Sequence, residues 1–324
     1  MSKASKEEIE NLRMMTKVAH LYHSKSLVQT EIAKSLGLSQ ARVSRLLAAA
    51  EENGIVRKIV VPPSGIFSEK EREIEASYGL SQVHIVDGEG EKDEELNESL
   101  GAAMGAVFNV LPLEGKTIGL TSWSRSLRSF VSSIELETRA NAKYIVEMLG
   151  GVGDPSLQHK ATNATEWLAK LTGATPLFLR VPGVVSSPIM KQALLEIDPH
   201  AQSAVDAFDN LDIALVGVGA SQPSEPYRNG SNFFTDQQFE AARNAGAVGE
   251  INLRFIDIEG RAVKLDFDEN VIGIELDQLK TVPIRVGVAG GKSKQDAVLA
   301  ACKGRWINVL VTDSITADYL IKQK

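Results

Sequence analysis

The sequence predicts an α/β protein in which a small helical domain precedes a larger domain built on a mostly parallel sheet. The chain has 324 residues, a length that suggests about two domains. Before about residue 60, apolar residues recur at spacings of three and four, which is the period of an amphipathic helix. From about residue 80 onward, short apolar runs alternate with longer helical stretches. That alternation is typical of a parallel sheet covered by helices.

The N-terminal region predicts three consecutive helices. They are expected over residues 7–23, 28–36 and 40–53, and the last one ends at Asn53-Gly54, a common C-terminal signal. Residues 55–61 are apolar and β-branched and predict a strand. The Pro62-Pro63-Ser64-Gly65 run that follows predicts a linker. The predicted domains are therefore 1–61, a linker at 62–67, and 68–324.

The larger domain is expected to begin with a helix over residues 68–78. Apolar runs then predict eight strands, at 83–86, 117–120, 144–149, 175–179, 213–218, 271–274, 284–288 and 307–312. Helices are expected between them, over 93–110, 124–136, 158–172, 188–197, 200–208, 235–244, 276–281 and 293–303.

Composition excludes several classes of protein. With 43% hydrophobic and 24% charged residues, the chain is an ordinary globular protein rather than a disordered or fibrous one. A single cysteine, Cys302, excludes an internal disulfide and a cysteine-built zinc site. No apolar run is long enough to cross a bilayer, and the N-terminus is polar and charged. We therefore expect a cytoplasmic protein without a membrane partner, a metal or a cofactor.

The net charge of −7 conceals an uneven distribution. The first 60 residues contain ten Lys and Arg against six Asp and Glu, whereas the rest of the chain contains 25 against 36. The head is therefore basic, with a net charge of +4, and the body is acidic, with −11. This asymmetry is expected when only one end of a protein meets a polyanion.

The segment Gln29–Leu47 predicts a helix-turn-helix. Ala33 is small where two helices would cross closely, and Gly37 can adopt the left-handed conformation that a sharp helix exit requires. Leu38 can fill the core beneath the turn, and Ser39 is a good N-cap for the next helix. An ordinary helical hairpin is the alternative, but it would not need this spacing.

The second helix of this motif presents a polar face suited to the major groove of double-stranded DNA. Val43, Leu46 and Leu47 share one side of it, so the residues opposite them are free to contact DNA. An arginine can donate two hydrogen bonds to guanine, and a glutamine can pair with adenine. The residues predicted to contact DNA are Gln29, Thr30, Ser39, Gln40, Ala41, Arg42, Ser44 and Arg45.

Together with motifs in the larger domain, this segment resembles the SorC family of bacterial sugar-responsive transcriptional regulators, also called sugar-binding DeoR-like regulators. The resemblance covers nearly the whole chain, and the order and spacing of its motifs make it specific. Its marks are Asn53–Val56, Ile118–Arg125, Leu149–Gly151, Leu215–Gly219, Gly246–Ile251, Ala289–Lys294 and Ile307–Asp313.

The resemblance implies a winged-helix-like head and a Rossmann-like effector domain related to sugar-phosphate isomerases. It further implies that this domain binds a phosphorylated sugar, has lost catalysis and assembles into dimers or tetramers. The implied function is control of a carbohydrate or polyol operon, more often as a repressor than as an activator. No catalytic residue is expected.

The run Thr121-Ser122-Trp123-Ser124 predicts a turn between a strand and a helix that begins near Arg125. Hydroxyl groups, backbone N–H groups and a helix N-terminus together favour an anion. In the family this loop holds the phosphate, which assigns that role to Thr121, Ser122 and Ser124, with Arg125 as a charge partner. Trp123 either stacks on the sugar, closes the pocket or packs in the core.

Further effector contacts are expected from glycines at strand ends and from one lysine. The resemblance assigns the lysine role to Lys294 rather than Lys292. Gly290–Lys294 is only superficially a nucleotide-binding P-loop, because Val286 stands where that motif needs glycine. The expected glycines are Gly119, Gly150, Gly151, Gly217 and Gly219.

Weaker candidates for binding sugar hydroxyls are Gln158, Asn163, Glu250, Asp257 and Asp266. His159 and His200 have no partners in the sequence that would make them metal ligands. Two other functions remain open from the sequence. The chain could be a sugar-phosphate isomerase- or aldolase-like enzyme with a fused helical head, although no second motif supplies a base. It could also be a protein–protein adaptor, which the basic head argues against.

Overall fold

The computed structural model describes residues 6–56, 66–134, 141–151, 155–223 and 232–324. The chain divides into two compact units, residues 1–62 and 63–324. The predicted linker at 62–67 lies mostly outside the described residues.

The N-terminal unit is a cluster of helices around a small apolar core. Helix α1 (Lys6–Ala19) continues into a π-helical turn, His20–Ser24, and is followed by α2 (Gln29–Leu36) and α3 (Gln40–Glu52). The three predicted helices are therefore confirmed. Of the strand predicted over 55–61, the first two residues form a bend and the others lie outside the described residues. The core is formed by Met15, Val18, Ala19, Ile32, Ala33, Val43, Leu46, Leu47 and Ala50.

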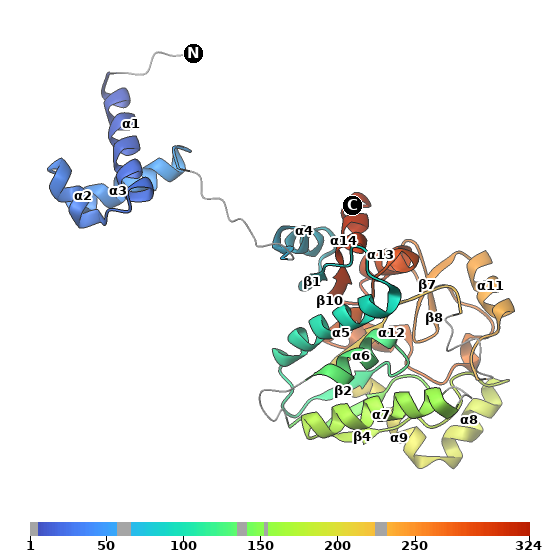
Figure 1. Ribbon diagram of the computed structural model, residues 1–324. Helices are drawn as coiled ribbons and strands as arrows, with labels where there is room; N and C mark the ends of the chain where they lie inside the picture. The colour runs from blue at the N-terminus through green and yellow to red at the C-terminus, as the bar shows by residue number, and fades with distance from the viewer. Residues whose placement is uncertain (1–5, 57–65, 135–140, 152–154, 224–231) are drawn as a thin grey trace. The chain divides into compact units, whose positions relative to one another are not determined.

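A seven-stranded parallel sheet organises the larger unit (Figure 1). The strand order is β1-β10-β9-β5-β2-β3-β4, and every neighbouring pair is parallel. The strands are β1 (Gln82–Val86), β2 (Thr117–Leu120), β3 (Tyr144–Glu147), β4 (Thr175–Leu177), β5 (Ile213–Gly217), β9 (Ile284–Val288) and β10 (Val309–Asp313).

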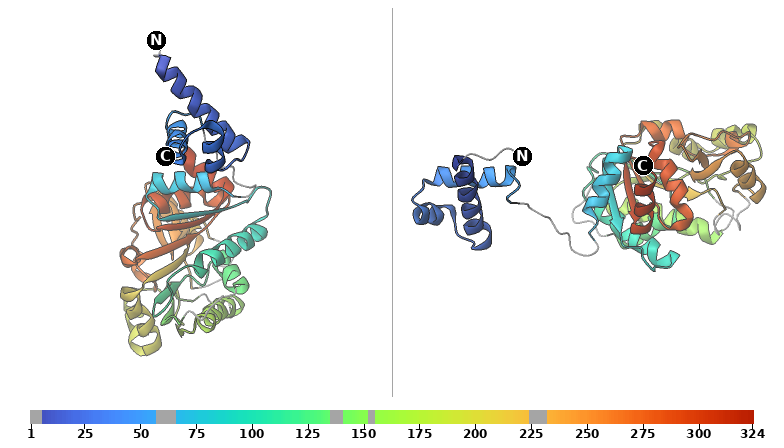
Figure 2. Two further views of the ribbon diagram at one scale, coloured as in Figure 1. Left: turned by 90° about the vertical axis from the view of Figure 1, so that its left-hand side faces the viewer. Right: turned by 90° about the horizontal axis from the view of Figure 1, so that it is seen from above.

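Helices cover both faces of this sheet, as the turned views in Figure 2 show. Side chains alternate between the faces along each strand: Ile213 and Leu215 pack into one core and Ala214 and Val216 into the other. The first core is covered by α5 (Asp93–Asn109), α6 (Arg125–Ser133) and α7 (Pro155–Thr172). The second contains residues of α4 (Ser68–Tyr78), α9 (Pro199–Asp206), α12 (Leu276–Thr281), α13 (Gln295–Lys303) and α14 (Ser314–Lys322). The described residues of this unit also form α8 (Pro188–Ile197) and α11 (Asp236–Asn244).

A second, antiparallel sheet has the order β6-β7-β8. Its strands are β6 (Gly219–Ala220), β7 (Ala247–Ile251) and β8 (Arg254–Asp257). The turn between β7 and β8 places Asn252 and Leu253 in the left-handed region, with φ of 51° and 61°. Positive φ at both central residues matches the twist of a tight hairpin; asparagine often adopts this conformation, whereas leucine rarely does.

The structure corrects the sequence prediction in three places. The strand predicted at 271–274 does not form, because Val271 and Gly273 make only isolated bridges, to Val184 and Leu149. The hairpin of β7 and β8 was not predicted, since its turn lacks an Asn-Gly or Asp-Gly signal. Helix α14 was also not predicted. The parallel α/β architecture is confirmed. Within the described ranges, no helix is both long enough and apolar enough to cross a membrane.

Candidate functional site

The α2–α3 turn has the geometry that its sequence predicts. Gly37 lies in the left-handed region at φ 66°, and the Leu38 N–H donates to the Ala33 carbonyl at 2.9 Å. The Ser39 hydroxyl caps α3 by accepting a hydrogen bond from the Arg42 N–H at 3.3 Å. The turn is therefore fixed by a glycine, a cap and an apolar anchor, because Leu38 packs against the core of the head.

The residues predicted to contact DNA lie on the surface of the head. Gln29 is half-buried and the other seven are exposed, while Val43 and Leu46 on the opposite side of α3 are buried. The Arg45 Nε donates to the Ala41 carbonyl at 3.4 Å, so this side chain lies along the helix. The exposed side of α3 therefore offers two guanidinium groups, an amide and a hydroxyl.

A cavity of about 210 Å³ lies at the carboxyl ends of β2, β5 and β9, which are neighbours in the sheet. After β2 the chain adds strands on one side of it, and β5 then pairs on the other side, so the cavity sits where the strand order reverses. Ligands of open α/β sheets bind at such switch points. We call this cavity the effector pocket, after the predicted effector residues that line it. It is lined by Thr121, Trp123, Ser124, Arg125, Gly217, Val218, Gly219, Ala220, Gln222, Pro223, Glu250, Asn252, Ser293 and Lys294.

The turn after β2 forms one wall of the effector pocket. The Ser124 hydroxyl caps α6 by accepting from the Leu127 N–H at 3.4 Å, so the N-terminus of this helix points at the cavity. Arg128, one turn further along α6, donates to the Trp123 carbonyl at 2.7 Å and to the Ser122 carbonyl at 3.4 Å. The turn is thus held from both sides, by its own cap and by a guanidinium.

The β7–β8 hairpin forms the opposite wall. The Thr121 hydroxyl donates to the Asn252 side-chain oxygen at 2.7 Å, which turns the amide nitrogen of this buried residue toward other partners. No described residue accepts a hydrogen bond from that nitrogen. The Glu250 carboxylate accepts from the Leu253 N–H at 2.7 Å and thereby supports the left-handed turn.

The effector pocket contains two ionisable groups of opposite sign with displaced pKa values. Burial raises the pKa of Glu250 to about 7, and the Leu253 N–H and the nearby Lys294 ammonium only partly offset this. Burial also lowers the pKa of Lys294, and repulsion from Arg125 adds to that effect. Low dielectric and little water make both charges costly when they are unpaired. The surroundings of the pocket therefore shift both groups toward their neutral forms.

Glycines at the end of β5 leave room for this arrangement. A Cβ on Gly217 would lie 2.8 Å from the Ser124 hydroxyl, and a Cβ on Gly219 would collide with the Glu250 carboxylate. Both positions therefore require the absence of a side chain.

The loop after β9 positions Lys294. The Gly291 N–H donates to the Asp313 carboxylate at 2.7 Å, and a Cβ on Gly290 would collide with the same carboxylate. Asp313 also caps α14 by accepting from the Ile315 and Thr316 N–H groups, at 3.0 Å each. The lysine thus follows a loop that is anchored on the neighbouring strand β10. Lys292, two residues earlier, is exposed and does not line the pocket.

Seven of the eleven predicted effector residues line the pocket: Thr121, Trp123, Ser124, Arg125, Gly217, Gly219 and Lys294. Gly119 lies inside β2, where a Cβ would collide with Met148. Ser122 is buried but does not belong to the cavity lining. Gly150 and Gly151 approach the backbone and side chains of Val181, Pro182 and Gln158 elsewhere in the fold.

Trp123 packs in the core, as one of the interpretations considered for it expects. It lines the pocket but is deeply buried, with a relative exposure of 4%, and it packs edge-to-face on Phe233 with the ring centroids 5.8 Å apart. No described residue accepts a hydrogen bond from its indole nitrogen.

Sequence reasoning missed Asn252, because its hydrogen bond to Thr121 joins residues 131 positions apart. It ranked Glu250 with four other polar residues, of which none lines the pocket. Gln158 and Asn163 line other cavities, as does Asp266, and Asp257 pairs with Arg261 at 2.8 Å. Among the described residues no group of three His, Cys, Asp or Glu could hold a metal ion.

Residues 66–322 match the family described as "Putative sugar-binding domain". The chain is 28% identical to the Sorbitol operon regulator of Klebsiella pneumoniae over 98% of this chain and 100% of that protein. It is 30% identical to the Transcriptional regulator LsrR of Escherichia coli O157:H7 over 95% of this chain and 94% of that protein.

A solved structure is similar over nearly the same length. The full-length Sorbitol Operon Regulator SorC from Klebsiella pneumoniae superposes with a TM-score of 0.71 at 26% identity, covering 96% of this chain and 99% of that one. These relatives are named as transcriptional regulators and not as enzymes, so the enzyme alternative is not supported. The chain belongs to the SorC family of sugar-binding transcriptional regulators.

Proposed function

We propose that this protein controls a carbohydrate or polyol operon by binding operator DNA through its head and a phosphorylated sugar through its effector pocket. The name of the Klebsiella relative supports a sugar operon as the target. The effector pocket supports a phosphorylated ligand. The chain would then be a ligand-gated regulator, more often a repressor in such systems than an activator.

The observation that carries the proposal is the convergence of positive charge and hydroxyl groups in one cavity. Lys294, Arg125 and the N-terminus of α6 meet the hydroxyls of Thr121 and Ser124 around a space of about 210 Å³. A helix N-terminus and two cations together favour a phosphate dianion over a neutral group.

The other wall of the effector pocket suits the sugar end of such a ligand. The Glu250 carboxylate can accept from sugar hydroxyls. The amide nitrogen of Asn252, which has no acceptor among the described residues, can donate to a hydroxyl or carbonyl oxygen. A buried donor without a partner costs free energy that a ligand oxygen would recover. One wall of the pocket would therefore bind the phosphate, and the other would bind the sugar hydroxyls.

The head is proposed to bind double-stranded DNA with the exposed side of α3 in the major groove. Arg42, Arg45 and Gln40 would contact base edges, as recognition helices of this motif do. Because a single head reads only one half-site, the protein is proposed to act as a homo-oligomer, a dimer or a tetramer, in the cytoplasm. A sugar phosphate that binds one arrangement of the oligomer more tightly would shift operator affinity.

A thermal-shift screen of phosphorylated sugars, each paired with its unphosphorylated form, tests the proposal. A true effector stabilises the protein in proportion to its occupancy, so the melting temperature should rise with the concentration of one phosphorylated sugar and not with its partner. Equal shifts with both forms would contradict a phosphate site. No shift with any phosphorylated sugar would contradict the proposed ligand class.

Operator binding should also weaken steeply as salt rises, because contacts to phosphates release counterions. A flat response to salt would instead favour a protein–protein role for the head.

A further inference from the structure

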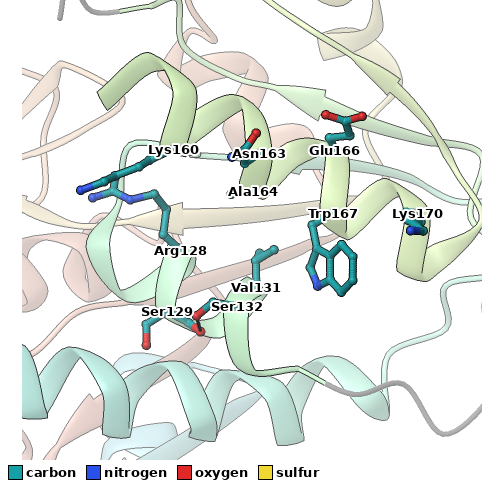
Figure 3. Close-up of a pocket in the computed structure, with 10 residues that line it drawn as sticks. All are labelled: Arg128, Ser129, Val131, Ser132, Lys160, Asn163, Ala164, Glu166, Trp167 and Lys170. Carbon is teal, nitrogen blue, oxygen red and sulfur yellow. Dashed lines mark hydrogen bonds between the residues drawn. The ribbon is translucent and has the colours of Figure 1, made fainter. Parts of the chain in front are cut away.

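A second cavity, of about 720 Å³, lies between α6 and α7 and shares no lining residue with the effector pocket. We call it the α6–α7 groove. Figure 3 shows it from the side, with α7 above and α6 below. Its volume falls within the range of sites for small ligands. Nothing in the proposed regulation by a sugar phosphate uses it.

An aromatic ring stands open at one end of the groove. Trp167 is 46% exposed, whereas the other two tryptophans, Trp123 and Trp306, are 4% and 5% exposed. Figure 3 shows the Trp167 ring pointing from α7 into the groove. The Lys170 ammonium lies 5.2 Å from the ring centroid. A large exposed ring beside a cation offers a stacking surface for a planar group.

Positive charge gathers at the other end. In Figure 3 the side chains of Arg128 and Lys160 extend toward the same side of the groove, away from the Trp167 ring. The Arg128 guanidinium is fixed there, because it donates to the Trp123 carbonyl at 2.7 Å. Glu166 also lines the groove, and Figure 3 shows its carboxylate on the opposite side of α7 from the Trp167 ring. Three cationic side chains, Arg128, Lys160 and Lys170, thus line the groove beside one carboxylate, and cationic side chains attract an anion.

The floor between the two ends is apolar. Val131 on α6 and the buried Ala164 on α7 line it, and Lys160, Ala164 and Trp167 recur at spacings of four and three on one face of α7. A ligand lying along the groove would therefore meet cations first, then an apolar surface, then an aromatic ring.

We propose that the α6–α7 groove binds a small planar aromatic anion, with its anionic group between Arg128 and Lys160 and its ring on Trp167. The anion could be a phosphate, as in a nucleoside monophosphate, or a carboxylate, as in an aryl carboxylic acid. Both share the chemistry that the groove offers. The site is separate from the effector pocket and does not depend on the identity of the sugar.

Calorimetric titration of the full chain with adenosine 5′-monophosphate and, separately, with 2-naphthoate tests this site and its anion. At least one probe is expected to bind with a Kd below about 1 mM. The probe that binds shows whether the groove accepts a phosphate or a carboxylate. Trp167→Ala and Lys160→Glu should each weaken that binding at least tenfold. Both residues are exposed, so circular dichroism should show that the variants fold.

Two control variants establish whether a bound probe occupies the α6–α7 groove. Lys322→Glu makes the same charge change at an exposed position on α14 and should leave probe binding unchanged. Lys294→Ala removes the cation of the effector pocket and should also leave it unchanged. The proposal is overturned if neither probe binds, if binding survives both groove variants, or if Lys294→Ala abolishes it, since the probe would then occupy the effector pocket.

Discussion

The exposed side of α3 and the effector pocket both present cations to an anion, but they do so in opposite surroundings. Arg42 and Arg45 lie exposed on one helix, within four residues of each other. Lys294 and Glu250 lie in a cavity assembled from segments between residues 121 and 294. A long polyanion can be read only by an accessible surface, whereas a small anion is distinguished by a site that removes its water.

This difference has energetic consequences. An exposed charge is screened by water and salt, so each contact contributes little by itself and affinity comes from several contacts together. A buried charge is costly without its partner, so one substitution in the pocket has a large effect. We therefore expect pocket variants to change binding or stability more strongly than single changes on α3 do.

The largest effect is expected from Glu250→Gln. The folded-state pKa of Glu250 is about 7, against about 4.5 when unfolded, so the folded protein binds the extra proton between these values. The stability due to Glu250 is therefore complete below about pH 4.5 and is lost as pH rises to about 7. Urea unfolding should show the wild type losing about 3 kcal/mol across this window relative to the variant.

Glu259→Gln is the matched control for that comparison, because Glu259 is an exposed carboxylate paired with Lys303 at 3.2 Å. Its unfolding curve should follow the wild-type pH dependence. Identical pH dependence in the wild type and Glu250→Gln would show that burial does not raise the pKa of the Glu250 carboxylate in the folded protein.

Lys294→Ala should weaken binding of the effector by about 1.5–3 kcal/mol, the typical value of a hydrogen bond to a charged group. Calorimetry with the sugar phosphate found by the thermal-shift screen measures this. Lys292→Ala provides the control, since that lysine is exposed and lies outside the pocket. Equal losses in both variants would mean that only the general charge of the loop matters.

Arg42→Ala and Arg45→Ala should each weaken operator binding by about 1–3 kcal/mol and relax the preference at one base pair. Fluorescence anisotropy with operator and scrambled DNA measures both effects. The effector affinity of these variants should remain that of the wild type. Unchanged DNA affinity in both would place the recognition surface somewhere other than this side of α3.

Ser39→Ala should have the smallest effect, about 1 kcal/mol, because it removes the cap that accepts from the Arg42 N–H. Hydrogen exchange at the start of α3 should become about fivefold faster. Ser44→Ala is the control, since Ser44 lies inside the helix and does not cap it. An unchanged exchange rate in Ser39→Ala would show that the turn is held by Gly37 and Leu38 alone.

The contrast between the two regions also explains what could be predicted from the sequence. On the head, the conformation of Gly37 and the cap at Ser39 follow from residues next to each other in the chain. The parallel sheet follows from its alternating pattern in the same way. In the pocket, Lys294 and Thr121 were reached through motifs that the family shares. The remaining contacts depend on tertiary pairing, and the sequence carries no local signal for that.

Asn252 illustrates the limit. Its place in the pocket wall depends on a hydrogen bond from Thr121 and on a left-handed turn at Asn252 and Leu253. The Asn-Leu pair is not a sequence signal for such a turn. The prediction of a strand at 271–274 was wrong for a related reason. The segment is apolar and buried, but the chain around it offers only single bridges rather than a continuous partner. Apolar runs predict burial more reliably than they predict pairing.

The most direct test of the account is the operator affinity of the wild type and Lys294→Ala, measured by anisotropy with and without the sugar phosphate identified in the screen. The account predicts that the ligand shifts wild-type affinity at least about fivefold, the lower end of a typical allosteric coupling. It predicts that Lys294→Ala without ligand binds DNA like the unliganded wild type and needs about 10- to 150-fold more ligand to respond. The account would be contradicted if a bound sugar phosphate left the operator affinity of the wild type unchanged. It would also be contradicted if Lys294→Ala responded fully at the ligand concentration that suffices for the wild type.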